Sequence, residues 1–443
     1  SKFSSFVVFN DHLYICDGET LPQKWDGVST STFPFGGVPH PATALTAALA
    51  GAGAGNVDDG THSYKVTFVT AEGETDPNIK SNVVTVADKA TDGKVDLTSI
   101  PTGPTSGGPT VTDRKIYRTV AGDTGNWKLL TTIADNTTTT YTDNTADAGL
   151  GADAPTSNGT ARIPADWTGT NFPKRIVKHG RGASERLWAF GCPSNLERIY
   201  AGATGDDNFL DASVVTIDIE TGDGFGIVGM EEYGDRLVPV GKRQPYLIDD
   251  LDADSTKWGY DPAQWEGGLG NDRLLVKTPN DLIAMSEDGE IYSVITTQQT
   301  GDYRSASIAR PAFIHKWIED NVDLAQIDDF HMVYDQAIRA IKIFVIRKGQ
   351  TKTDTALVFS IDRPPEEAWV RHRYIGQNFA SVATVVRVAA GNWKIYTGGH
   401  AGTAYKLEST TLTDDGVHYD SSFLTIDDPF ANPRVNKRYD RDW

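Results

Sequence analysis

The sequence is poor in cysteine and in long apolar runs, and each shortage excludes a class of protein. Its 443 residues include two cysteines, Cys16 and Cys192, too few for a disulfide framework in a chain of this length. Neither has histidines nearby at the spacing of a metal site, so we expect two buried free thiols and assembly in a reducing cytoplasm. Because no apolar run approaches ~18 residues, we expect no membrane span.

Positive charge is also scarce, since 41 Lys and Arg face 60 Asp and Glu, for a formal net charge of −19. Proteins that hold nucleic acid need basic patches, and this chain offers only short groups such as Arg371-His372-Arg373. A protein that grips DNA or an anionic membrane is therefore disfavoured. The net negative charge is compatible with a protein that lines a DNA channel without binding the DNA, because like charge repels phosphate. Solubility is the simpler explanation of the acidity.

Motifs of catalysis are missing as well. The sequence has no G-x-S-x-G, no H-E-x-x-H and no phosphate-binding G-x-x-x-x-G-K-[ST]. Cys192 follows His179 at a distance along the chain, but a buried or turn cysteine is the better interpretation. Residues 286–292 resemble the Asp-box turn of sialidases with one residue too few, and we interpret them as a structural turn. We expect no enzyme, no catalytic residue and no cofactor.

One acidic loop resembles part of a calcium site. Asp250, Asp252 and Asp254 alternate as in the first half of an EF-hand loop. The sixth position is Ser255 instead of Gly, and the twelfth is Asp261 instead of Glu. We predict a solvated loop, with a weak calcium site as the alternative and no other metal site.

A hairpin pattern recurs along the chain, in which a polar turn separates strands of alternating apolar residues. Its equivalent strand positions are Leu13, Leu187, Leu237, Leu282, Ile341 and Trp393. Four of the five intervals are about 50 residues, the length of a four-stranded propeller blade. The first interval is longer by about 120 residues, which predicts an insertion.

The inserted segment has its own strand pattern. Residues 40–60 are rich in Ala and Gly and predict a linker or an extended edge, and residues 147–160 predict an exit linker. Between them lie six strand-like segments: 62–77, 81–89, 95–100, 113–120, 126–135 and 138–143. Strands at this spacing, joined by Gly, Pro and Asp turns, are typical of a small antiparallel sandwich.

The predicted fold class is therefore all-β, a roughly six-bladed β-propeller with an inserted immunoglobulin- or fibronectin-like β-sandwich. Residues 1–40 would form the first blade, 41–155 the sandwich, and 156–443 the remaining blades and a closing strand. That closing strand would come from residues 418–430 and pair with residues 4–9. A helix is predicted over residues 310–323.

Two resemblances extend these predictions. Tyr64-Lys65-Val66, residues 69–75 and residues 115–119 resemble a fibronectin type III-like domain of the kind embedded in bacteriophage virion proteins. The remaining frame resembles the propeller proteins that form the tail nozzle, or DNA-stabilising plug, of short-tailed bacteriophages. The segments that carry this second resemblance are 13–27, 234–248, 272–294 and 308–321.

The second resemblance implies a structural protein of the virion tail, assembled in the bacterial host's cytoplasm. It implies a homo-oligomeric ring, typically a hexamer, that contacts other tail or adaptor proteins while DNA passes through its lumen without specific binding. Trp258 and Trp265 lie in a loop and are our candidates for a subunit contact. The main alternative is a carbohydrate-binding or adhesin propeller on a virion or cell surface, and a polysaccharide hydrolase is a third.

Overall fold

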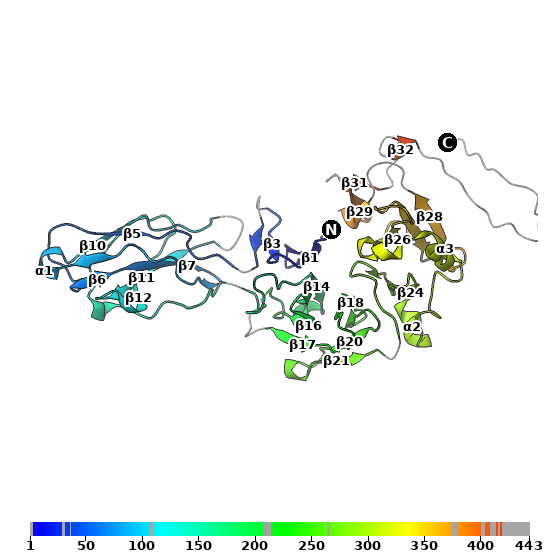
Figure 1. Ribbon diagram of the computed structural model, residues 1–443, viewed down its shortest axis with the longest axis horizontal. Coiled ribbons are helices and arrows are strands. Elements are labelled where there is room, and N and C mark those ends of the chain that lie inside the picture. Colours follow the sequence, from blue (N-terminus) through cyan, green and yellow to red (C-terminus); the bar gives the residue numbers. More distant parts are fainter. Residues whose placement is uncertain are drawn as a thin grey trace, which may run out of the picture. The chain divides into compact units, whose positions relative to one another are not determined.

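The computed structural model is an all-β protein of many small antiparallel sheets (Figure 1). It describes residues 3–28, 32–35, 37–105, 110–160, 162–207, 209, 214–263, 266–373, 380–399, 404–407, 413–414 and 417–418. The chain divides into two compact units, Ser1–Ala309 and Arg310–Trp443. Each unit is described by itself below.

The first sheet of unit 1 is a four-stranded meander in the order β1-β2-β3-β4. Its strands are β1 (Ser5–Phe9), β2 (His12–Cys16), β3 (Gln23–Trp25) and β4 (Phe33–Pro34). Asn10 and Asp11 join β1 to β2 with φ angles of +46° and +58°. Two positive φ angles are those of a type I′ turn, whose twist matches that of paired strands and which Asn and Asp tolerate.

Residues 46–143 form sheets of their own, as the alternating strand pattern predicts. The strands are β5 (Thr46–Leu49), β6 (Gly60–His62), β7 (Tyr64–Thr70), β8 (Gly73–Glu74), β9 (Val84–Val86), β10 (Val95–Thr98), β11 (Asp113–Val120), β12 (Thr124–Ile133) and β13 (Tyr141–Asp143), with the short helix α1 (Lys89–Asp92). One sheet has the order β13-β10-β5, another the order β12-β11-β7-β8, and β6 pairs with β9. Most of their buried side chains form one core that runs from Leu45 to Ile133, while Phe68 of β7 packs with Val38 and Val111 in a separate cluster.

Two buried arginines hold this sandwich together from inside. The Arg118 side chain is fully buried, and its guanidinium donates to Asp143 at 2.6 Å and to Asp147 at 2.7 Å. The Tyr64 hydroxyl donates to the same Asp143 carboxylate at 2.9 Å. Arg114 is likewise buried and bonds to Asp135 at 2.9 Å. Asp147 belongs to the segment predicted as an exit linker, so this part of the segment packs on the sandwich instead of leaving it.

The chain then returns to the meander type of sheet. The next sheet has the order β14-β15-β16-β17 and is followed by the pairs β18-β19 and β20-β21 and by the sheet β22-β23-β24. The strands are β14 (Arg175–His179), β15 (Arg186–Cys192), β16 (Asn195–Ala201), β17 (Val215–Asp218), β18 (Gly229–Tyr233), β19 (Arg236–Val240), β20 (Tyr246–Asp249), β21 (Gly259–Pro262), β22 (Leu275–Lys277), β23 (Leu282–Met285) and β24 (Ile291–Ser293), with α2 (Val294–Thr300) after them. Residues 9–35 and 167–209 share one core, so the sheets on either side of the sandwich pack together.

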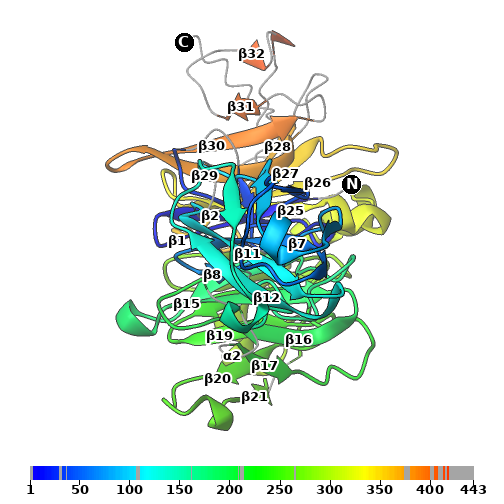
Figure 2. The ribbon, with the colours of Figure 1, turned by 90° about the vertical axis from the view of Figure 1, so that its left-hand side faces the viewer.

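Unit 2 repeats the same architecture. It begins with α3 (Ile314–Asn321) and holds the sheets β25-β26-β27-β28 and β29-β30-β31 and the pair β32-β33. The strands are β25 (His331–Asp335), β26 (Ala340–Val345), β27 (Thr355–Ser360), β28 (Trp369–Arg373), β29 (Ala380–Ala389), β30 (Asn392–Gly399), β31 (Ala404–Lys406), β32 (Thr413–Asp414) and β33 (Val417–His418). The long hairpin of β29 and β30 is clear in Figure 2. Its buried face shares a core with the sheet before it.

The six equivalent positions found in the sequence all lie on the second strand of a sheet, namely β2, β15, β19, β23, β26 and β30. First strands of consecutive sheets also lie against each other, β1 against β14, β14 against β18 and β18 against β22 in unit 1, and β25 against β29 in unit 2. Each sheet thus presents its first strand to its neighbour.

Several details differ from the sequence predictions. The helix predicted from residue 310 begins at Ile314, because Phe313 adopts a left-handed φ of +58° that interrupts helical geometry. Residues 46–49 form an edge strand, which is the extended alternative for that segment. Of the aromatic residues in the recurring hairpins, Trp188 and Tyr14 are buried, whereas Trp25 and Trp393 are only half-buried. Most of the predicted closing strand, residues 419–430, lies outside the described residues.

Candidate interface around Trp258

Trp258 lies at the end of the loop that joins β20 to β21. The loop ends in a short 3-10 turn, Ser255–Lys257. The backbone N–H of Thr256 in this turn donates to the Asp254 carboxylate. The indole Nε1 of Trp258 donates to the backbone oxygen of Asp252 at 2.6 Å. Local hydrogen bonds therefore fix the orientation of the indole ring.

The face of the Trp258 ring is used inside the protein. It stacks on Trp188 with ring centroids 5.9 Å apart and planes 23° apart, and the Arg186 guanidinium lies 4.5 Å from its centroid. Burial lowers the pKa of Arg186, and the charge of Asp250 opposes this shift. One face of the Trp258 side chain therefore packs on the core between two sheets. Only the part of the side chain that is still exposed is open to a partner. Trp265, the other candidate contact, lies outside the described residues.

The three aspartates of the possible calcium loop are divided between two partners, His179 and Lys257. Asp250 lies 3.5 Å from Nε2 of the buried His179, whose Nδ1 is 3.3 Å from Glu232. Asp252 and Asp254 both face Lys257, at 3.2 and 3.9 Å. Hydrogen bonds from Thr256 lower the pKa of Asp254.

Across the described residues, no group of three or more His, Cys, Asp or Glu side chains is placed to hold a metal ion. Within the same part of the chain, no helix is long and apolar enough to cross a membrane.

The sequence candidates for chemistry are also separated. In the β14–β15 register His179 pairs with Arg186 and Arg175 with Phe190, so Cys192 lies at the opposite end of the hairpin from His179. Cys16 and Cys192 are free and buried in one core, as predicted. Burial raises the pKa of Cys192 to about 12. Residues 286–290 form the turn between β23 and β24, where the backbone N–H of Ser286 donates to the backbone oxygen of Glu290 at 2.9 Å and the N–H of Glu290 donates to the Ser286 hydroxyl at 3.2 Å.

Six exposed acidic residues lie on or beside the strands β17, β20 and β21, and sequence reasoning had not grouped them. We call this set the acidic rim and define it as Asp218, Glu220, Asp249, Asp252, Asp254 and Asp261, all exposed. The backbone N–H of Glu220 donates to the Tyr260 hydroxyl at 3.0 Å, which ties the end of β17 to β21. The six residues are spread over about forty positions of sequence, and the printed link between their two sheets is the bond between Glu220 and Tyr260.

The basic group noticed in the sequence forms an edge strand. β28 contains Arg371, His372 and Arg373 and lies at the end of the sheet order β25-β26-β27-β28. Arg371 and Arg373 are exposed, as is Val370 at 51%. We call these five residues, Trp369–Arg373, the basic edge.

The sandwich carries a hollow of about 450 Å³. Its lining includes Phe68 and Ile100, both buried, and Pro39 and Pro101. His40 on its wall is 3.0 Å from Asp76. Such a mainly apolar hollow with hydroxyl groups around it is the type of surface on which a sugar or a proline-rich peptide rests.

Comparison with known proteins gives no family. No family model matches the chain, and no curated protein matches it. Among solved structures it is similar to BBS1N in the crystal structures of its complex with ARL6DN. The mercury-soaked crystal gives 11% identity over 71% of this chain and 86% of that chain, with a TM-score of 0.32. The lead-soaked crystal gives 12% identity over 71% of this chain and 87% of that chain, with a TM-score of 0.31. The computationally designed Ika8 protein is similar at 10% identity over 92% of this chain and 95% of that chain, with a TM-score of 0.29. TM-scores this low carry no argument about fold or function.

Proposed function

We propose that this chain is a structural subunit of a bacteriophage tail, a nozzle or DNA-exit ring that works with other tail proteins to hold and release DNA. Its architecture would be a six-bladed propeller, with residues 41–155 inserted after the first blade as a fibronectin type III-like sandwich. The protein would act by shape and charge and have no catalytic turnover.

The observation that carries the proposal is the series of antiparallel sheets whose first strands lie against one another within each unit, β1, β14, β18 and β22 in unit 1 and β25 and β29 in unit 2. A meander sheet exposes two faces, and radial stacking is the arrangement that buries both while leaving short outer edges. The shared core of residues 9–35 and 167–209 supports an insertion, because the chain leaves this core and comes back to it. An acidic surface suits a wall beside DNA, because it repels phosphate.

The test is to locate the protein in a virus particle. Antibody labelling and cryo-electron microscopy of virions should place the chain at the tip of the tail, around the exit path of the DNA. A virion preparation without the chain, or the chain on the capsid surface, would contradict the proposal.

The alternative is a carbohydrate-binding or adhesin propeller. The hollow lined by Phe68 and Ile100 is the feature that favours it. A glycan array probed with the full chain decides between the two, because an adhesin binds at micromolar to millimolar sugar and a tail ring does not. Because Phe68 is buried, Phe68→Ala would also destabilise the fold and is not a suitable variant for this test. Thr139→Trp fills the hollow from its wall and should abolish any glycan signal.

A further inference from the structure

We propose that the basic edge of one copy of this chain docks against the acidic rim of a second copy, so that copies join head to tail. The inference rests on the proposed function insofar as a tail ring needs such a contact. The two surfaces are different, which makes the interface heterologous. Heterologous contacts between identical chains generate rings or filaments instead of two-fold dimers.

The first argument is that the two arginines of the basic edge, Arg371 and Arg373, have no carboxylate partner among the residues that the structure describes. Three other exposed arginines are bonded to carboxylates of the same chain, with the pairs Arg181–Asp235 at 2.7 Å, Arg304–Asp288 at 3.4 Å and Arg339–Asp362 at 2.8 Å. Among the described residues no carboxylate lies within ion-pairing distance of Arg371 or Arg373, although acids outnumber bases 60 to 41. The guanidinium of Arg371 lies instead 4.9 Å from the Trp317 ring centroid, which holds it in place.

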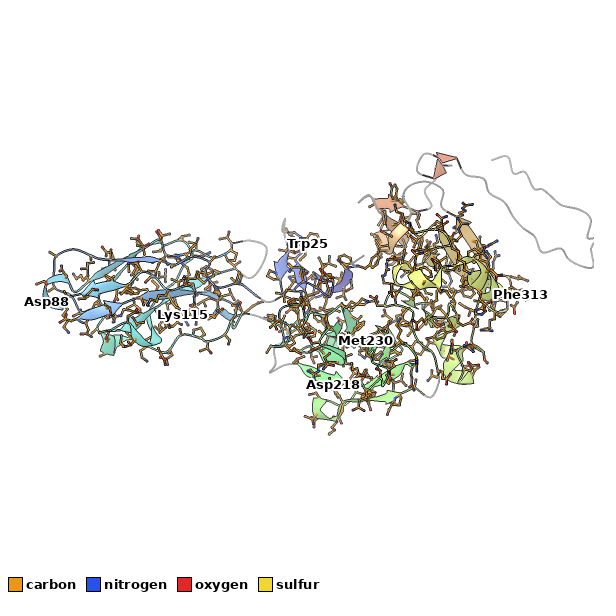
Figure 3. The ribbon with its side chains drawn as sticks, viewed as in Figure 1. Trp25, Asp88, Lys115, Asp218, Met230 and Phe313 are labelled. Atoms are coloured by element: carbon orange, nitrogen blue, oxygen red, sulfur yellow. The ribbon has the colours of Figure 1, made fainter. Side chains whose placement is uncertain are left out.

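The second argument is that the acidic rim also contains charged groups, here carboxylates, that have no partner of opposite charge among the described residues. Asp218 bonds to Arg198 at 2.7 Å, and Asp252 faces Lys257. Glu220 and Asp261 have no cationic partner among the described residues, and they flank Tyr260 and its bond to the backbone of Glu220. Figure 3 labels Asp218 on the same outer strand, β17. One surface therefore offers two free arginines and the other two free carboxylates.

The third argument is backbone geometry. β28, β17 and β21 each end a sheet in the described part of the chain, and an edge strand leaves backbone donors and acceptors unpaired. Lone edges pair with other chains unless charge of the same sign keeps them apart. Here the charges of the two edges are opposite, so charge selects this pairing and disfavours the pairing of like edges.

The experiment is a charge-swap cycle in the full chain, with mass measured by sedimentation velocity and native mass spectrometry. Arg371→Glu with Arg373→Glu, and separately Glu220→Lys with Asp261→Lys, should each weaken self-association at least tenfold. The four changes together should restore it to within about threefold, because the pairing is re-formed with signs reversed. Raising salt from 0.05 to 0.5 M, values we set for the assay, should weaken wild-type association, because exposed charges are screened.

Matched controls are Arg363→Glu and Asp92→Lys, which reverse an exposed and a half-exposed charge at positions that belong to neither defined surface. They should leave the association constant unchanged. Circular dichroism should show that every variant keeps the wild-type strand signal, so that a loss of association is not a loss of folding.

Three outcomes would overturn the inference. A monomeric wild type at about 100 μM would do so, as would association that the swaps leave unaltered. Binding of a fluorescent 30-base-pair duplex that Arg371→Glu/Arg373→Glu abolishes, without any change in mass, would show that the basic edge serves DNA instead. None of these outcomes decides the proposed function, which depends on finding the chain in the tail of a particle. If the chain lies in the tail but the charge swaps leave self-association unaltered, the tail ring is retained and this interface is rejected.

Discussion

The buried ion pair in the sandwich offers the sharpest test of the structure. Replacing Asp143 by Ala removes the carboxylate that accepts from Arg118 at 2.6 Å and from Tyr64 at 2.9 Å. Arg118 keeps Asp147 as its second partner, but it is fully buried and cannot turn to water. Breaking one partner of a buried pair costs about 3–5 kcal/mol, and the Tyr64 hydroxyl loses its partner as well.

Hydrogen exchange of the full chain measures this loss where it occurs. A loss of about 3–5 kcal/mol corresponds to roughly 100- to several-thousand-fold faster exchange of the slowest amides in β7 and β11, because 1.4 kcal/mol is a factor of ten. Amides of β15 and β26 should exchange at the wild-type rate, since their cores do not include the sandwich.

Two further variants make the reasoning refutable. Asp153→Ala breaks the exposed pair with Lys128, whose side chains are 49% and 39% accessible, and should change exchange by less than about fivefold. Arg118→Met with Asp143→Leu should recover most of the loss, because an apolar pair of similar size removes both desolvation costs. Exchange in β11 that is unchanged in Asp143→Ala would refute the buried pair.

Three other predictions concern the sheets outside the sandwich. Burial raises the pKa of Asp207, but its bonds with Lys24 and Tyr14 outweigh burial and hold that pKa below its usual value. The stabilisation supplied by the Asp207 carboxylate is therefore present above the unfolded pKa near 4 and is lost as pH falls. Asp207→Asn should lower the melting temperature at pH 7 and flatten the decline of the melting temperature in acid, and a decline parallel to that of the wild type would contradict this. Cys16 and Cys192 should react with a thiol reagent at pH 8 only after unfolding, because burial raises both thiol pKa values, and rapid labelling of native protein would refute their burial. Trp188→Ala should cost about 3–5 kcal/mol in urea unfolding, whereas Trp188→Phe should cost clearly less, and equal losses would remove the stacking argument.

The sequence by itself determined where the hairpins lie. Alternation of apolar residues and turn residues predicted β11 at residues 113–120, the bounds that the structure has, because strand periodicity is a local property. It also predicted that the cysteines are free, since two are too few for a disulfide framework in a chain of this length, and the structure confirms this. Both inferences need only neighbouring residues or counts.

Only the tertiary structure decided how distant residues are used. Trp258 looked like an exposed contact because its partner, Trp188, lies seventy positions earlier and no pattern connects the two. The start of α3 depended on the left-handed Phe313, which helical periodicity does not reveal. The acidic rim and the paired Arg118 and Asp143 exist because antiparallel sheets bring separate segments together, and such contacts follow from packing rather than from local sequence.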